Sequence, residues 1–186
     1  MNIFCWNCRG AGKAATVREL RDFARQFAPL VLCIVETQLP RDRVENLAST
    51  LGYDNAYAVS SSGRSGGLGI FWNNEIKIEN FGYSAYHIDA HVTLPGAPQW
   101  RLTVMYGEAQ VSDRGKTWDV LRSLAEDNDH PWLCFGDFNE VLCPEEHVGV
   151  GQCSNAQIQA LRDAVNVCML LHWFCWYSMD LRKEGH

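Results

Sequence analysis

Residues 132–141 read WLCFGDFNEV, an apolar run that stops at Gly136 and places Asp137 and Asn139 on either side of Phe138. Side chains two residues apart on an extended backbone point to the same face, so Asp137 and Asn139 are predicted to address one ligand. Polar side chains gathered at the end of a buried strand are well placed for binding, because the sheet holds them rigidly. These two residues are therefore the first candidates for chemistry.

Three other apolar runs also reach a polar side chain near their ends. Asn7 follows IFCW, Glu36 follows LVLCIV and Tyr106 follows LTVM. Strand ends border the crevice in which sheet enzymes bind ligands, which favours a functional role for these positions. Asn, Asp and Gly also end strands as ordinary turn residues, and this is the commoner role for any one of them. The combination of positions favours a functional site.

Strand and helix patterns alternate through the first part of the chain. Thr16 and Glu19 have the spacing of a capping box for a helix that Pro29 closes. Gly52 stops a second helical segment. The predicted strands of this part are residues 3–6 and 30–36, and the segment before Gly52 carries Val44, Leu47, Ala48 and Leu51.

The middle of the chain reads as short strands of mostly alternating polarity, which is typical of an antiparallel sheet. A helix that contains Trp118 and Leu121 precedes the WLCFGD strand, and Ser154 and Gln157 form a second capping box. No repeat or linker divides residues 1–186, so we predict one α/β domain built on mixed sheets. The predicted strands are residues 66–72, 75–79, 87–94, 100–106, 132–137 and 172–178.

Composition fits a folded domain and limits its partners. The 186 residues are 47% hydrophobic and 20% charged, close to the globular average, and their formal net charge of −6 opposes general attraction to nucleic acid. Phosphate binding must therefore rest on local cations or a bound metal.

The eight cysteines fall largely in apolar runs, and neither a signal peptide nor a run of roughly 18 apolar residues is present. We expect reduced thiols, no membrane partner and an intracellular location, nuclear or cytoplasmic.

Three further motifs have both a functional and a structural interpretation. Cys5 and Cys8 have CxxC spacing, but they bracket a strand end instead of opening a helix, which favours structural thiols over a redox pair. His87, Asp89 and His91 would share one face of a strand, either as a metal site or, more commonly, as a solvated face. RSGGLG lacks the Lys-Ser/Thr of a phosphate loop, so a tight turn is favoured.

The chain contains, in this order, WNCRG (6–10), IVETQ (34–38), SGGLGIFW (65–72), VMYGE (104–108) and GDFNE (136–140). These segments resemble the endonuclease/exonuclease/phosphatase superfamily, and most closely the apurinic-type endonuclease domain of plant LINE-type (non-LTR) retrotransposons. The resemblance runs from Met1 to about residue 170, and the last residues resemble more loosely the hairpin that follows in the family. It implies a partial four-layer α/β sandwich, with two packed mixed or antiparallel sheets flanked by helices and without the C-terminal strands.

The resemblance also implies hydrolysis of phosphodiesters in nucleic acid, with DNA as the ancestral substrate and Mg²⁺ or Mn²⁺ as the cofactor. Glu36 would be the main metal ligand, with Asn7 beside it. Asp137 would orient and deprotonate the attacking water. Asn139 would help to hold the phosphate, and Tyr106 would donate a hydrogen bond to a phosphate oxygen.

The sequence departs from the family pattern after GDFNE. The family has an RLDR-like strand and a Ser-Asp-His motif downstream, and residues 141–186 contain neither; Asp129-His130 precedes GDFNE in a predicted loop. Arg9 and Ala109 also replace residues that are acidic or amide in many relatives. We therefore expect a domain that is incomplete at its C-terminus, weak or inactive as a nuclease, poorly soluble and prone to self-association through an uncovered sheet edge. The alternative is a catalytically dead remnant or an interaction domain.

Overall fold

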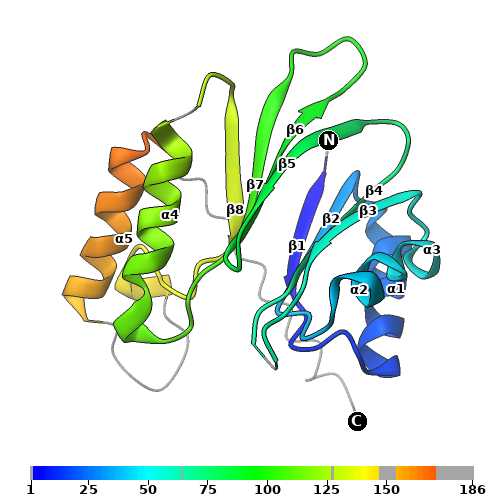
Figure 1. Ribbon diagram of the computed structural model, residues 1–186, viewed down its shortest axis with the longest axis horizontal. Coiled ribbons are helices and arrows are strands. Elements are labelled where there is room, and N and C mark those ends of the chain that lie inside the picture. The colour runs from blue at the N-terminus through cyan, green and yellow to red at the C-terminus, as the bar shows by residue number, and fades with distance from the viewer. Residues whose placement is uncertain (1, 64, 127, 147–153, 171–186) are drawn as a thin grey trace.

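Two four-stranded sheets pack face to face in the computed structural model, which describes residues 2–63, 65–126, 128–146 and 154–170 (Figure 1). The strand order is β1–β2–β4–β3 in the first sheet and β5–β6–β7–β8 in the second. The strands are β1 (Ile3–Asn7), β2 (Val31–Val35), β3 (Asn55–Val59), β4 (Leu68–Trp72), β5 (Lys77–Tyr83), β6 (His87–Thr93), β7 (Trp100–Tyr106) and β8 (Trp132–Asp137). The helices are α1 (Ala14–Phe27), α2 (Arg41–Glu45), α3 (Leu47–Leu51), α4 (Gly115–Glu126) and α5 (Asn155–Val167), with short 3₁₀ helices η1 (Val111–Asp113) and η2 (Pro144–Glu146).

Both sheets are mixed, as predicted. β1 pairs with β2 and β7 pairs with β8 in parallel, whereas the other neighbours are antiparallel. Asn7 lies opposite Val35, and Tyr106 lies opposite Asp137. The carboxyl ends of these four strands therefore meet at one end of the sandwich, which is the lower end in Figure 1.

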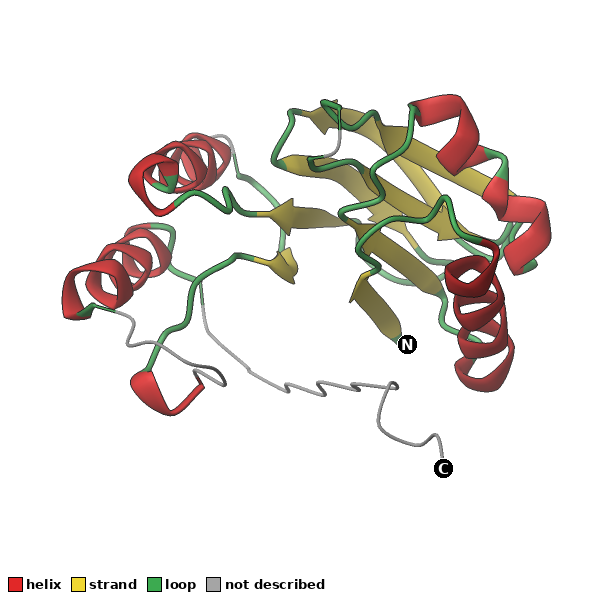
Figure 2. Cartoon of the chain, turned by 90° about the horizontal axis from the view of Figure 1, so that it is seen from below, coloured by secondary structure: helices red, strands yellow, loops and turns green. Residues whose placement is uncertain are grey.

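Three apolar layers hold the sandwich together, so the chain has four layers in the order helix, sheet, sheet, helix (Figures 1 and 2). The central layer lies between the sheets and includes Val35, Leu68 and Val104, all fully buried. Helices α1 to α3 cover the outer face of the first sheet, and α4 and α5 cover the outer face of the second. This is the α/β sandwich of two packed sheets flanked by helices that the family resemblance implies.

Local capping signals predict one helix start correctly and another incorrectly. The Ser154 hydroxyl accepts from the Gln157 N–H, and the Gln157 side chain accepts from the Ser154 N–H, so the capping box of α5 is confirmed. The capping box predicted at Thr16 and Glu19 is wrong. α1 begins earlier, at Ala14, because the alanines before Thr16 are strong helix formers and continue the helix back to an uncapped Lys13.

The sequence pattern also misses one strand and one helix break. β3 carries NAYAV, whose small alanines give a weak strand signal, and it forms an edge of the first sheet next to β4. The helical segment before Gly52 is divided at Asn46 into α2 and α3. Gly52 ends α3 in the left-handed conformation, with φ of 87°, as expected of a glycine cap.

His87, Asp89 and His91 lie on one strand, β6, but the predicted solvated face is wrong for the first two. His87 and Asp89 are only 8% and 9% exposed, and burial lowers the pKa of His87. Asp89 pairs with the buried Arg101, which also donates to the Leu124 carbonyl in α4. The alternation of residues 87–91 correctly predicts that the three side chains share one face of β6. It does not predict that α4 packs over this face, because that depends on tertiary contacts.

The sequence also predicts the absence of a membrane-spanning helix and the presence of a strand at residues 172–178. Among the residues that the structure describes, no helix combines the length and the apolar character needed to cross a membrane. The strand predicted at residues 172–178 lies outside the described residues.

Candidate active site

Asn7 and Asp137 meet where the two sheets come together. Asn7 is the last residue of β1 and Asp137 is the last residue of β8, and the Asn7 Nδ2 donates a 2.8 Å hydrogen bond to the Asp137 Oδ2. Both side chains are half-buried. Residues that are 130 positions apart in the sequence therefore form one polar cluster at the lower end of the sandwich in Figure 1.

A tight turn, not an extended strand, brings Asn139 to Asp137. The Asp137 Oδ1 accepts from the Asn139 N–H at 2.9 Å, and Asn139 has a φ of 52°. The prediction that the two side chains share a face of an extended backbone is therefore wrong, although the residues do lie together. The Asn139 Nδ2 donates to the Gly107 carbonyl at 2.6 Å, which ties the turn to the chain after β7. Asn tolerates this left-handed conformation better than most residues.

Gly136 lets β8 approach β7 closely just before this turn. Its φ is 142°, and a Cβ there would lie 2.0 Å from the Met105 carbonyl oxygen. The register Met105 to Gly136 and Tyr106 to Asp137 depends on this approach. The glycine that ends the apolar run therefore has a structural role next to the site.

Glu36 comes from the loop after β2, which is held by main-chain hydrogen bonds. The Gly10 N–H donates to the Glu36 carbonyl at 2.9 Å, and the Thr37 N–H donates to the Gly67 carbonyl at 3.1 Å. Glu36 has a φ of 56°, and its Oε1 accepts from the Gln38 Nε2 at 3.2 Å. Gln38 is a residue of this site that sequence reasoning missed, although it lies within the IVETQ segment.

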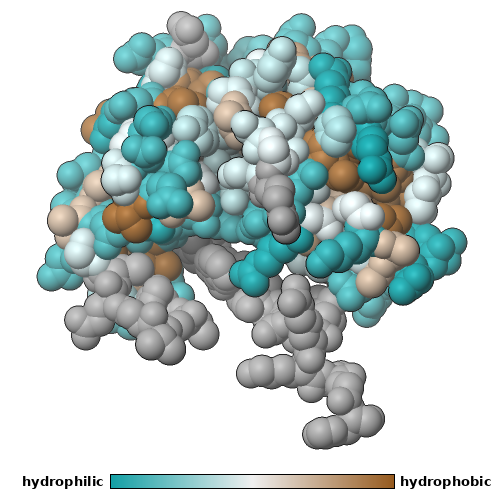
Figure 3. All heavy atoms as spheres, turned by 60° about the horizontal axis from the view of Figure 1, so that its bottom comes forward, coloured by the Kyte–Doolittle hydropathy of each residue, from teal (hydrophilic) through white to brown (hydrophobic). Residues whose placement is uncertain are grey.

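Tyr106 ends β7, opposite Asp137 in the register of β7 and β8. It is 8% exposed, and burial, followed by the negative charges of Glu36 and Asp137, raises the pKa of Tyr106 to about 12, against a smaller opposing effect of a hydrogen bond with Asn139. The phenol therefore stays protonated at neutral pH and remains a hydrogen-bond donor. Figure 3 turns this end of the molecule toward the viewer, and its visible surface is largely hydrophilic with small apolar patches.

The oxygen atoms of this cluster fit a hard divalent cation. Glu36 keeps Oε2 beside the hydrogen-bonded Oε1, and Asn7 offers Oδ1, which also accepts from the Arg9 N–H at 3.2 Å. Within the described ranges neither Glu36 nor Asp137 forms an ion pair with a basic side chain. Among the residues that the structure describes, no three His, Cys, Asp or Glu side chains gather as a dedicated metal cage would require. A sparse oxygen set that leaves room for several waters suits Mg²⁺ or Mn²⁺.

The CxxC, RSGGLG and Asp129-His130 motifs lie in surroundings that favour a structural role over a functional one. Burial raises the pKa of Cys5 and of Cys8 to about 12, which opposes thiolate formation, and both are free cysteines. Gly66 and Gly67 have positive φ and accept main-chain hydrogen bonds from the loop after β2, so the tight-turn interpretation is favoured. Asp129-His130 lies in the loop before β8.

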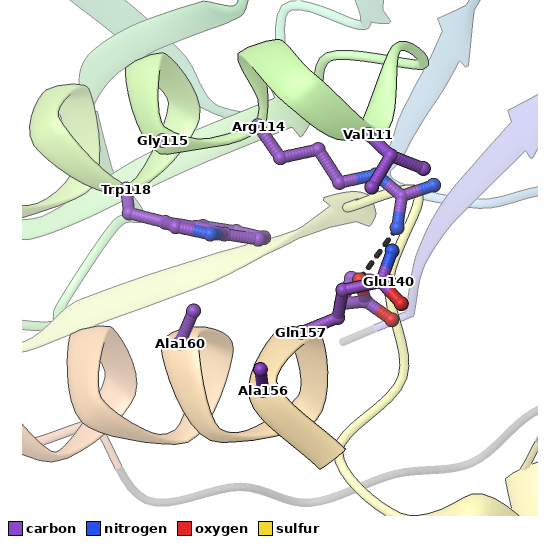
Figure 4. A pocket seen from close by; sticks show the side chains of 8 residues that line it. All are labelled: Val111, Arg114, Gly115, Trp118, Glu140, Ala156, Gln157 and Ala160. Atoms are coloured by element: carbon purple, nitrogen blue, oxygen red, sulfur yellow. Dashed lines mark hydrogen bonds and ion pairs between the residues drawn. The ribbon is translucent and has the colours of Figure 1, made fainter. Parts of the chain in front are cut away.

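A cavity of about 230 Å³ adjoins the turn after β8 and is drawn in Figure 4. It lies between the first turns of α4 and α5, with Trp118 and Ala160 among its apolar lining residues. The Arg114 guanidinium forms an ion pair there with Glu140, whose side chain is 1% exposed. Because Glu140 directly follows Asn139, this ion pair anchors the site turn to the start of α4. Sequence reasoning missed it, since nothing local relates positions 114 and 140.

The fold and the site together define a class of protein. The family model described as the Endonuclease/Exonuclease/phosphatase family matches residues 4–179, and the chain belongs to this family. No curated protein matches the chain.

Solved structures share the fold at low sequence identity. An AP endonuclease from Archaeoglobus fulgidus has a TM-score of 0.71 and 14% identity, and the match covers 90% of this chain and 70% of that one. The AP endonuclease LMAP from Leishmania major has a TM-score of 0.65 and 17% identity, with 90% and 66% covered. The 3′ phosphatase NExo from Neisseria, bound to a product DNA hairpin, has a TM-score of 0.64 and 17% identity, with 90% and 71% covered.

Proposed function

We propose that residues 1–186 form one endonuclease/exonuclease/phosphatase-type domain that hydrolyses phosphodiesters in nucleic acid with the help of Mg²⁺ or Mn²⁺. The observation that carries this proposal is the convergence of Asn7, Glu36, Tyr106 and Asp137 at one end of the sandwich. The similar structures support nucleic acid as the substrate, because two are AP endonucleases and one is a 3′ phosphatase bound to a DNA hairpin.

Each side chain has one task in this proposal. Glu36, with Asn7 beside it, holds the divalent cation, which neutralises charge on the phosphate oxygens. Asp137 orients the attacking water and accepts its proton, and the hydrogen bond from Asn7 fixes the Asp137 carboxylate for that step. Tyr106, protonated at neutral pH, donates a hydrogen bond to a phosphate oxygen. Asn139 helps to hold the phosphate, and its side-chain amide is itself held by the bond to the Gly107 carbonyl.

A plant LINE-type retrotransposon is the proposed origin of the domain, and the five ordered segments from WNCRG to GDFNE support it. Sequencing of the flanking DNA for a reverse transcriptase reading frame tests this origin. Action on nucleic acid also implies a nuclear or cytoplasmic location, which a fluorescent fusion tests.

Activity of these 186 residues alone is expected to be weak. No aspartate is followed by a histidine in residues 140–186, whereas the family pattern has such a pair downstream of GDFNE. Loss of one preorganised transition-state contact lowers the rate by about 10²-fold or more. The second candidate is a catalytically dead remnant or interaction domain.

Nicking of supercoiled plasmid in Mg²⁺ or Mn²⁺ separates the two candidates. The hydrolase proposal expects slow nicking that EDTA stops and that Asp137→Ala lowers by about 10²-fold or more. Asp119→Ala, which removes an aspartate of α4 whose side chain is 78% exposed, is the control and should nick at the wild-type rate. Equal rates for wild type and Asp137→Ala would leave the interaction domain as the better account.

Self-association through an open sheet edge is also proposed. β8 ends the strand order of the second sheet, and among the described strands none pairs with its outer edge. Leu133 in β8 is 39% exposed. Unpaired strand edges are templates for pairing with another chain, and a lysine there blocks it. Light scattering should show less association for Leu133→Lys than for wild type.

A further inference from the structure

The Gln38 side chain lies between Glu36 and the loop after β1. Its Nε2 donates to the Glu36 Oε1 at 3.2 Å. Its Oε1 lies 3.2 Å from the point where a Cβ on Gly10 would be, so the absence of a side chain at Gly10 leaves the space that the carboxamide fills. The contacts with Glu36 on one side and Gly10 on the other restrict the Gln38 side chain to a defined rotamer.

The main chain under Gln38 is held from two directions. The Gln38 N–H donates to the Gly66 carbonyl at 3.1 Å, and the Ala11 N–H donates to the Thr37 carbonyl at 2.8 Å. Thr37, between Glu36 and Gln38, is fully buried. Because the backbone is fixed, the remaining freedom of Glu36 lies in its side-chain torsions, and the bond from Gln38 restricts those.

The Gln38 side chain is uncharged, which is compatible with a Glu36 carboxylate that also binds a cation. Its amide occupies one carboxylate oxygen and leaves Oε2 available, without adding a positive charge that would compete with a metal. Hydrogen bonds to metal-binding carboxylates orient the ligand, and their loss typically lowers metal affinity by about 10- to 100-fold.

We propose that Gln38 is a positioning residue that holds the Glu36 carboxylate ready for Mg²⁺ or Mn²⁺. This inference rests on the metal-dependent function proposed above. It assigns to Gln38 an effect on metal affinity through Glu36 and no contact with the substrate.

Titration of the purified chain with Mn²⁺, followed by isothermal calorimetry and by the electron paramagnetic resonance of free Mn²⁺, tests the proposal. Gln38→Met keeps the length of the side chain but removes the donor, and should weaken Mn²⁺ binding by about tenfold. Gln38→Asn keeps the amide but shortens its reach, and should give a similar loss. Gln159→Met is the matched control: its Nε2 donates to the Asp163 Oδ1 at 2.7 Å on the exposed side of α5, away from the site, and binding should not change.

Thermal melting without metal shows whether each variant keeps its fold, because a positioning role leaves the metal-free melting temperature near the wild-type value. Suppose that Glu36→Gln weakens Mn²⁺ binding but both Gln38 variants bind Mn²⁺ as tightly as the wild type. That result would overturn this inference, while the proposed metal site at Glu36 would stand. Absence of saturable Mn²⁺ binding to the wild type would overturn the inference together with the proposed function. Weaker binding by both Gln38 variants, with an unchanged control, supports the inference.

Discussion

Two loops deliver the carboxylates of the candidate site, and they are held in different ways. The loop after β2, residues 36–38, is fixed by main-chain hydrogen bonds to the loop after β1 and to Gly66 and Gly67. The turn after β8, residues 137–139, is fixed largely by side chains: Asn7 binds Asp137, Asp137 binds the Asn139 N–H, and Asn139 binds a carbonyl after β7. The fold of residues 36–38 should therefore tolerate changes of side chain within the loop, whereas the fold of residues 137–139 should be sensitive to loss of the side chains that hold it.

Gly136→Ala is the largest expected perturbation and affects the second loop. An alanine Cβ would lie 2.0 Å from the Met105 carbonyl oxygen and 2.8 Å from its nitrogen, and backbone atoms of a central strand cannot move aside. We expect a loss of unfolding free energy of about 4 kcal/mol or more, measured by urea denaturation. Gly115→Ala in α4, where a Cβ meets nothing within 4 Å, should be neutral or stabilising by about 0.5–1 kcal/mol. A Gly136→Ala protein within 1 kcal/mol of wild type would remove the case for a close approach of β8 to β7.

Arg114→Met tests the anchor of the same loop. It leaves the Glu140 carboxylate, 1% exposed, without its guanidinium partner, and removal of one member of a buried ion pair destabilises by about 3 kcal/mol. Arg122→Met removes an exposed arginine paired with Asp119 and should change stability by less than about 1 kcal/mol. Chemical denaturation of both variants measures the difference. Equal effects would mean that the turn after β8 does not depend on its buried ion pair.

The strand ends were the part of the site that the sequence could indicate. Apolar runs that stop at Asn7, Glu36, Tyr106 and Asp137 predict strands with polar ends. β2 and β7 are buried, as such runs indicate, whereas the edge strands β1 and β8 are only half-buried. The cross-sheet bond between Asn7 and Asp137 is consistent with that pattern.

What could not be predicted depends on tertiary contacts or on single backbone torsions. Asp89 has the spacing of an exposed face, and only the cover of α4 and the pairing with Arg101 bury it. Asn139 has a positive φ that its position in the sequence does not reveal, so an extended backbone was the wrong assumption. The Arg114–Glu140 pair joins a helix start to a turn 26 residues later, a separation that no local pattern records.

Gly67→Ala tests the first loop through a neighbour that holds it, because the Gly67 carbonyl accepts from the Thr37 N–H. Gly67 has a φ of 88°, and a Cβ there would meet the Thr37 hydroxyl and Ser61, so we expect a loss of about 2 kcal/mol. Gly96→Ala is the matched control, because Gly96 has a φ of 77° and a Cβ there meets nothing within 4 Å. It should lose about 1 kcal/mol from backbone strain alone. If the two variants lose the same stability in urea, packing against Thr37 contributes nothing and the first loop is less constrained than its main-chain bonds indicate.

Tyr106 gives an effect that is confined to high pH, because burial of its phenol and the charges of Glu36 and Asp137 raise its pKa. The pKa of Tyr106 is about 12 in the folded chain and about 10 when unfolded, so the folded state holds the proton more tightly. This contribution to stability is fully present below pH 10 and is lost as the pH rises from 10 to 12. Wild type should therefore lose stability relative to Tyr106→Phe across that interval, in urea denaturation with reduced cysteines. Tyr53→Phe is the reference: burial raises the pKa of Tyr53 to about 12 as well, but away from both carboxylates. Parallel stability curves for wild type and Tyr106→Phe would show that the folded chain does not raise the pKa of this phenol.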